Sequence, residues 1–126
     1  MIDRRHFLVT ALAAVITVPW LASAVRAHHG WSWTDTGEFQ LTGLIREIRL
    51  GNPHGVLMVQ AEEEMWTAEI GQPYRNARAG LTEEMLQPGV EVTLIGHRSA
   101  DASELRMKAE RVIIAGVLYD LYPNRS

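Results

Sequence analysis

The chain contains no cysteine among its 126 residues. Disulfide bonds and thiolate metal ligands are therefore excluded. A small domain of this composition has to be held together by packing of its apolar side chains. Any metal site has to be built from histidine, carboxylate or the amino terminus.

Basic residues are also in short supply. The chain has 12 Lys and Arg against 15 Asp and Glu, a net charge of −3 with histidine neutral. Without its first 27 residues it would hold 9 basic and 14 acidic residues, and 9 − 14 gives −5. This balance argues against nucleic acid as a partner and provides no basic patch for acidic lipids.

The usual signatures of catalysis are missing. No serine lies in a Gly-x-Ser-x-Gly setting, no glycine-rich loop could hold a phosphate, and there is no cysteine nucleophile. Neighbouring carboxylates occur only in the hydrophilic runs Glu62–Glu64 and Glu83–Glu84. We therefore expect a binding protein rather than an enzyme.

No apolar run is long enough to span a bilayer. The run from Val9 to Leu21 holds about 13 residues, where a membrane helix needs about 20. It follows Arg4-Arg5-His6-Phe7-Leu8, which resembles a twin-arginine export signal, and precedes Val25-Arg26-Ala27, a small-residue cleavage pattern. We predict that residues 1–27 are a signal peptide cleaved after Ala27, which delivers a folded domain to the periplasm without embedding it in the membrane. An uncleaved membrane anchor is the alternative.

Alternation of apolar and polar residues predicts a mostly β structure. Gly43 interrupts the phase of the first segment and indicates a bulge in a long strand. A helical turn is expected at 74–79, and Thr82 is a candidate cap for a short helix over 83–86. The predicted strands cover residues 38–50, 56–61, 65–70, 90–98 and 105–118.

Three strands, a short helix and two further strands form the order typical of an OB-like five-stranded barrel. We therefore predict an all-β domain with one short helix at residues 38–118, preceded by an arm at 28–37 and followed by a tail at 119–126. An open antiparallel meander or a sandwich is the alternative architecture.

A series of short motifs follows the predicted signal peptide in a fixed order. They are His28-His29, Gly43, Asn52-Pro53-His54, Trp66-Thr67-Ala68-Glu69, Pro88-Gly89 and Gly96-His97-Arg98. In this order they resemble the DUF6152 family of small exported bacterial proteins of unknown function. The resemblance implies no activity, but it implies particular importance for His28, His29, His54, Glu69 and Arg98.

The first two of these histidines suggest a metal site. Cleavage after Ala27 would make His28 the amino terminus, so that its α-amine and its ring could chelate one ion beside His29. His54, in a turn fixed by Pro53, is a candidate for a further imidazole ligand. Nitrogen ligands in near-planar geometry favour copper(II). The open alternative is that the terminal pair is solvated and that His54 stabilises its own turn.

The remaining motif residues suggest a polar site without metal. Glu69 is predicted on the strand face opposite Trp66, where it could pair with Arg98 at the end of the next strand. These three residues, together with Asn52, form either a structural polar site or the lining of a ligand site. The sequence thus predicts a periplasmic copper-binding protein, with a metal-free module for a small molecule or a protein partner as the alternative.

Overall fold

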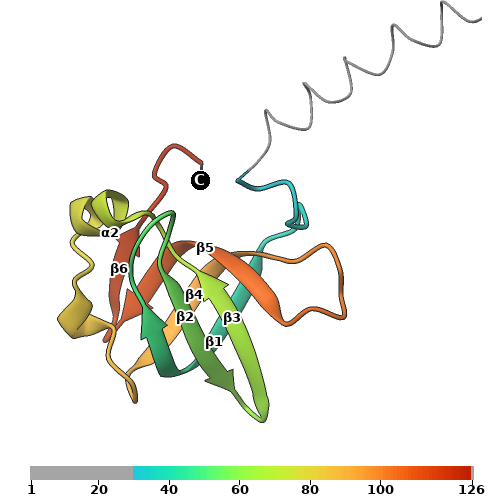
Figure 1. Ribbon diagram of the computed structural model, residues 1–126, viewed down its shortest axis with the longest axis horizontal. Helices are drawn as coiled ribbons and strands as arrows, with labels where there is room; N and C mark the ends of the chain where they lie inside the picture. Colours follow the sequence, from blue (N-terminus) through green and yellow to red (C-terminus); the bar gives the residue numbers. More distant parts are fainter. Residues whose placement is uncertain (1–29, 126) are drawn as a thin grey trace, which may run out of the picture. The chain divides into compact units, whose positions relative to one another are not determined.

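The computed structural model describes residues 30–125 (Figure 1). The predicted signal peptide, with His28 and His29, lies outside the described residues. The chain divides into a unit of residues 1–32 and a unit of residues 33–126, and the second unit contains the fold. Its elements are β1 (Phe39–Arg49), β2 (Val56–Ala61), β3 (Glu64–Glu69), α2 (Pro73–Ala79), the 3-10 helix η1 (Glu83–Met85), β4 (Glu91–Arg98), β5 (Arg106–Ile114) and β6 (Val117–Asp120).

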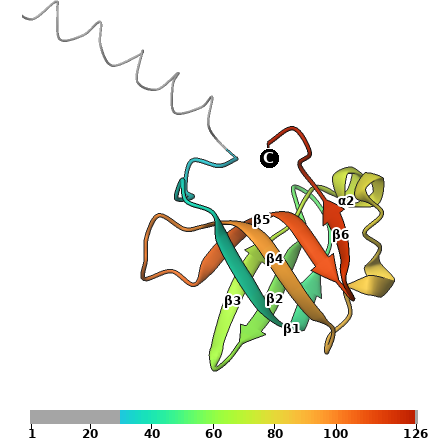
Figure 2. The ribbon, with the colours of Figure 1, turned by 180° about the vertical axis from the view of Figure 1, so that it is seen from behind.

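The strands form one sheet in the order β3-β2-β1-β4-β5-β6. Neighbouring strands in this order are antiparallel, and β3 also pairs in parallel with β5. That additional pairing closes the first five strands into a barrel and leaves β6 as an extra strand at its edge (Figure 1, Figure 2). The predicted OB-like five-stranded barrel with one short helix is therefore confirmed, and closure excludes the open meander.

Inward-facing side chains from all five barrel strands form the core. Alternation places Leu57 and Val59 of β2 inside, and Trp66 and Ala68 of β3 opposite them. A buried aliphatic side chain stabilises a fold by roughly 1.5–3 kcal/mol. Burial of this kind takes the place of disulfides. The largest fully buried side chains are Ile45, Leu57, Ile70, Leu86, Leu94, Met107, Leu121, Val59, Val92 and Val112.

The bulge predicted at Gly43 lies elsewhere. The register of β1 against β2 shifts between Ile45 and Glu47, which makes Arg46 the extra residue. Gly43 serves a different purpose, because a Cβ atom there would overlap the backbone carbonyl of Gln60 in β2. Glycine at this position allows the two strands to approach closely where the barrel curves.

The predicted final strand, 105–118, is two strands. Ala115 and Gly116 both have positive φ, at 51° and 79°, and form a two-residue hairpin turn between β5 and β6. Paired positive φ values match the twist of the flanking strands. β6 therefore continues to Asp120, inside the predicted tail, and the next residue, Leu121, is fully buried.

The helical segment between β3 and β4 lies beside β6 (Figure 1, Figure 2). α2 begins with Pro73 in its first turn and ends at Gly80, whose φ of 89° is left-handed. The predicted helix at 83–86 is only a three-residue 3-10 turn, and the Thr82 side chain makes no capping hydrogen bond. No helix within residues 30–125 is long and apolar enough to cross a membrane.

Candidate functional site

A buried carboxylate lies at the centre of the polar residues. Glu69 ends β3 on the outer face of the barrel, and only 4% of its surface is exposed. His54 Nε2 lies 3.1 Å from Glu69 Oε1, and Arg106 Nη2 donates a hydrogen bond to Glu69 Oε2. The carboxylate therefore bridges an imidazole from the β1–β2 loop and a guanidinium from β5.

The loop that carries His54 is anchored to the end of β3. The amide of Gly55 donates to the carbonyl of Gly71 at 3.0 Å, and the amide of Ile70 donates to the carbonyl of Gly55 at 2.9 Å. Asn52 and Pro53 lie exposed at the outside of the same loop, joined by a cis peptide bond. The backbone contacts hold the imidazole in front of Glu69, and 27% of its side chain remains exposed.

Lys108 lies next to Glu69 on the same outer face. In the sheet register it is opposite Glu69 on one side and His97 on the other. Only 7% of Lys108 is exposed. Burial lowers the pKa of Lys108 below its ordinary value, the charge of Glu69 opposes this shift, and nearby guanidinium groups add to it.

A second buried carboxylate, Glu110, lies further along β5 on the same outer face. Arg106, Lys108 and Glu110 thus form a row of charged side chains along β5. The register shifts so that Ile95 pairs with Arg111 and Gly96 pairs with Ala109, which leaves Glu110 as the extra residue of a bulge. Glu110 accepts a hydrogen bond from Arg125 Nε at 2.6 Å. The bulge keeps Ala109 in the core while its charged neighbour faces outward.

His97 of β4 lies beside Glu110 in this row. Its Nε2 lies 3.7 Å from Glu110 Oε1. Its Nδ1 is 2.8 Å from the carbonyl oxygen of Gly37. Both ring nitrogens therefore face protein oxygen atoms, and the ring is half-buried.

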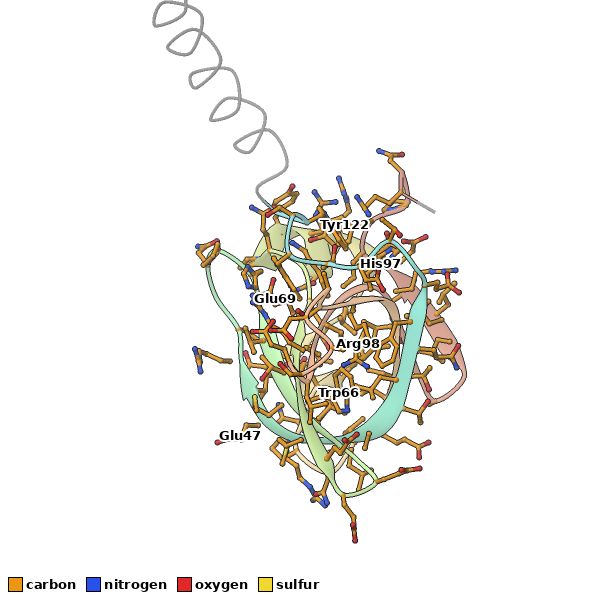
Figure 3. All side chains as sticks on the ribbon, turned by 90° about the vertical axis from the view of Figure 1, so that its right-hand side faces the viewer. Glu47, Trp66, Glu69, His97, Arg98 and Tyr122 are labelled. Atoms are coloured by element: carbon orange, nitrogen blue, oxygen red, sulfur yellow. The ribbon has the colours of Figure 1, made fainter. Side chains whose placement is uncertain are left out.

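The C-terminal segment and α2 cover the other side of the row. Arg75 of α2 lies over the ring of Tyr122 at 4.3 Å and donates to the carbonyl of Leu121 at 3.2 Å. Burial raises the pKa of the Tyr122 hydroxyl, against the opposing effect of the Arg75 charge. Figure 3 shows Glu69, His97 and Tyr122 toward the end of the barrel where the C-terminal segment lies.

The predicted pairing of Glu69 with Arg98 is wrong. Arg98 lies over the rings of Trp66 and Phe39, at 4.9 Å and 5.4 Å, and donates to the carbonyls of Ala102 and Glu104. Trp66 is itself part of the core, and Figure 3 shows it beside Arg98 within the barrel. Trp66 and Arg98 therefore stabilise the interior, while the partner of Glu69 is Arg106.

The sequence model described as "Family of unknown function (DUF6152)" matches residues 15–107. The chain belongs to this family. The match spans both the His54 loop and the Glu69 strand, and it ends before Lys108 and Glu110. No curated protein matches the chain.

The solved structures that resemble this chain do so at low sequence identity, so the similarity concerns the fold and nothing else. The Stn1–Ten1 complex of S. pombe has a TM-score of 0.48 and 20% identity, over 61% of this chain and 57% of that chain. A ZRD-deleted mutant of TiaS in complex with agmatine has a TM-score of 0.50 and 14% identity, over 67% of this chain and 26% of that chain. The DUF6152 chain thus spans less than two thirds of either matched chain.

Sequence reasoning missed most of the outer-face row. Arg106, Lys108 and Glu110 alternate along β5, and this period of two does indicate a common face. A charged face of this kind is normally solvated. Nothing in the pattern shows that the C-terminal segment covers it.

Proposed function

We propose that this DUF6152 protein is an exported periplasmic binding protein that takes up copper(II) through His28, His29 and His54. The proposal keeps the predicted signal peptide, with cleavage after Ala27 and His28 as the mature amino terminus. The observation that carries it is the contact between His54 and the buried carboxylate of Glu69.

A metal-binding histidine usually gives its second ring N–H to a carboxylate, which orients the ring and selects its tautomer. Glu69 can accept the Nε2 proton of His54 at 3.1 Å, which leaves Nδ1 as the nitrogen with a free lone pair. Arg106 holds the other oxygen of the same carboxylate. The ring is thus oriented before any metal arrives, and it keeps an exposed edge.

The other ligands in this proposal lie outside the described residues. Within residues 30–125 no three His, Asp or Glu side chains form a group that could hold a metal. The proposal takes its amine and a ring nitrogen from His28, with His29 beside it. Amine and imidazole nitrogens together favour copper(II) among the divalent metals.

The fold reduces the surface on which the metal-free alternative could bind a ligand. Its predicted face combined Trp66, Arg98 and Glu69, but the first two are used inside the barrel. Asn52 is exposed at the edge of the His54 loop. What remains for a small molecule or a protein partner is the outer face around Glu69.

The test compares four forms of the processed protein in copper(II) titrations. These are the protein beginning at His28, the same protein with one extra residue ahead of His28, and the variants His54→Gln and His97→Gln. An intact-mass measurement of the exported protein first establishes where cleavage occurs. We expect the extra residue and His54→Gln each to weaken copper binding by about tenfold or more, equivalent to about 1.4 kcal/mol.

The His97→Gln variant is the matched control, because it also removes one imidazole but one whose nitrogens already face Glu110 and Gly37. It should bind copper like the unaltered protein. Equal, weak binding by the protein with and without the extra residue would disprove the copper site.

A further inference from the structure

The segment just ahead of β1 is fixed to the loop between β4 and β5. The amide of Ala100 donates a hydrogen bond to the carbonyl of Trp33 at 3.0 Å. The next residue, Thr34, forms an isolated β-bridge with Ser99. Trp33 is also the first residue of the unit that contains the fold. The arm predicted at residues 28–37 is therefore attached to the barrel from Trp33 onward.

The side chain of Trp33 lies on the side of the barrel that carries Glu69. Arg106 Cζ lies over the Trp33 ring, 3.8 Å from its centroid. The same guanidinium donates to Glu69 Oε2, while Glu69 Oε1 lies 3.1 Å from His54 Nε2. A guanidinium can do both because it stacks with its face and donates hydrogen bonds from its edge. Only two side chains, Arg106 and Glu69, therefore separate Trp33 from His54.

The barrel does not need the Trp33 ring for its packing. Within residues 30–125, neither the buried core nor the apolar side chains packed against it include Trp33. Its half-buried ring instead covers the guanidinium that binds Glu69. The contact therefore orients the arm and the polar residues below it, and it adds little to the core.

The chain ahead of Trp33 is short. His28 lies five residues earlier, and the turn at residues 30–33 limits the separation of the two Cα atoms to about 14 Å. An amino terminus tethered at Trp33 is confined to a small volume on the side of the barrel where His54 lies. Such a tether raises the effective concentration of the terminal ligands at the His54 ring.

We propose that Trp33 is a positioning residue for the copper site: it holds the amino-terminal arm on Arg106 and so brings the mature amino terminus to His54. This inference rests on the copper proposal, since that proposal requires the terminus and His54 to meet. Trp33 binds no metal itself. It acts through the chain that it anchors and through the contact of Arg106 with Glu69, which orients the His54 ring.

Copper(II) titrations of processed Trp33 variants test this role. Trp33→Ala removes the ring and should weaken copper binding by about threefold to tenfold, the size of an aromatic–guanidinium contact. Its electron paramagnetic resonance spectrum with copper should shift toward that of His54→Gln, because both variants lose the His54 ligand. Trp33→Phe keeps an aromatic face for Arg106 and should restore both the affinity and the spectrum.

The matched control is Tyr74→Ala on α2, which removes an aromatic ring from two other guanidinium groups, those of Arg75 and Arg78. It should bind copper like the unaltered protein. Unchanged affinity and an unchanged spectrum for Trp33→Ala would overturn the positioning role. Equal losses for Trp33→Ala and Tyr74→Ala would also overturn it, because they would show a general loss of stability.

A metal-free measurement separates this inference from the copper proposal. Because the chain has no cysteine, a single Gly30→Cys substitution can carry a nitroxide spin label on the arm. The label should broaden the NMR signals of the Gly55 and Ile70 amides, which join the His54 loop to the end of β3, and Trp33→Ala should reduce this broadening.

The label also covers the event that a substitution at Trp33 prevents folding. No broadening with Trp33 in place would overturn the inference by itself. Broadening that depends on Trp33, together with copper binding that ignores an extra residue ahead of His28, would disprove the copper site while confirming that Trp33 holds the arm beside His54.

Discussion

Replacing Glu69 by Gln tests how much the outer-face network stabilises the barrel. The substitution keeps the size of the side chain but presents a neutral amide to two donors, His54 and Arg106. One of them must then face an NH₂ group instead of an oxygen. Because Glu69 is only 4% exposed, water cannot easily take the place of the lost acceptor.

The expected loss follows from these contacts. A hydrogen bond to a charged group contributes roughly 1.5–3 kcal/mol. The Arg106 side chain is 37% exposed, so solvent screens part of the loss on that side. We expect Glu69→Gln to lower the free energy of unfolding by about 2 kcal/mol, out of a total of about 5–15 kcal/mol for a domain of this kind.

Urea unfolding followed by tryptophan fluorescence measures this loss, since Trp66 lies in the core. Glu64→Gln is the matched control, because it makes the same change on the same strand at an exposed residue. It should lie within about 0.5 kcal/mol of the unaltered protein. A double-mutant cycle with Arg106→Met should give a coupling of about 1 kcal/mol or more. A Glu69→Gln protein as stable as the Glu64→Gln control would refute the reasoning.

Two further substitutions probe β5 and its neighbour. Gly96→Ala should lower the free energy of unfolding by about 3 kcal/mol or more, because the new Cβ would overlap the Lys108 carbonyl and lie 2.9 Å from the Ala109 Cα. The control is Gly37→Ala, where a new Cβ would have no atom within 4 Å. In the same urea assay this control should change the free energy of unfolding by less than about 0.5 kcal/mol. Lys108→Met should change how stability depends on pH. Since burial lowers the pKa of Lys108 in the folded protein, the unfolded chain keeps that proton to about pH 10.5, and stability should rise with pH up to that point. The variant should lack this rise in urea unfolding measured as the pH approaches about 10.5, and a rise as steep as that of the unaltered protein would contradict the assignment.

The alternation of apolar and polar residues was sufficient to predict four of the strands and the connectivity of the barrel. Alternation located the strands that became β1 to β4 to within one residue at each end. The position of the helical segment between the third and fourth strands indicated the connectivity of a closed barrel. Such features depend on residues near one another in sequence.

The errors concern contacts between distant segments. Arg98 and Arg106 flank the same loop, and only the barrel decides that Arg106 lies beside Glu69 while Arg98 faces inward. The hairpin after β5 was missed because Ala115, with a φ of 51°, is not a residue that normally indicates such a turn. Without that turn, the burial of Leu121 and the covering of Lys108 could not be foreseen.

The parallel pairing of β3 with β5 also has a kinetic consequence. Thr67 pairs with Arg106 and Glu69 with Lys108, and α2, η1 and β4 all lie between the two strands in the chain. Pairing between such distant segments carries a large loop-closure entropy and tends to form late in folding. We therefore expect Glu69 and Lys108 to meet only after the intervening strands are in place. The contact between these two strands therefore reports that the whole barrel has folded, and not just one of its hairpins.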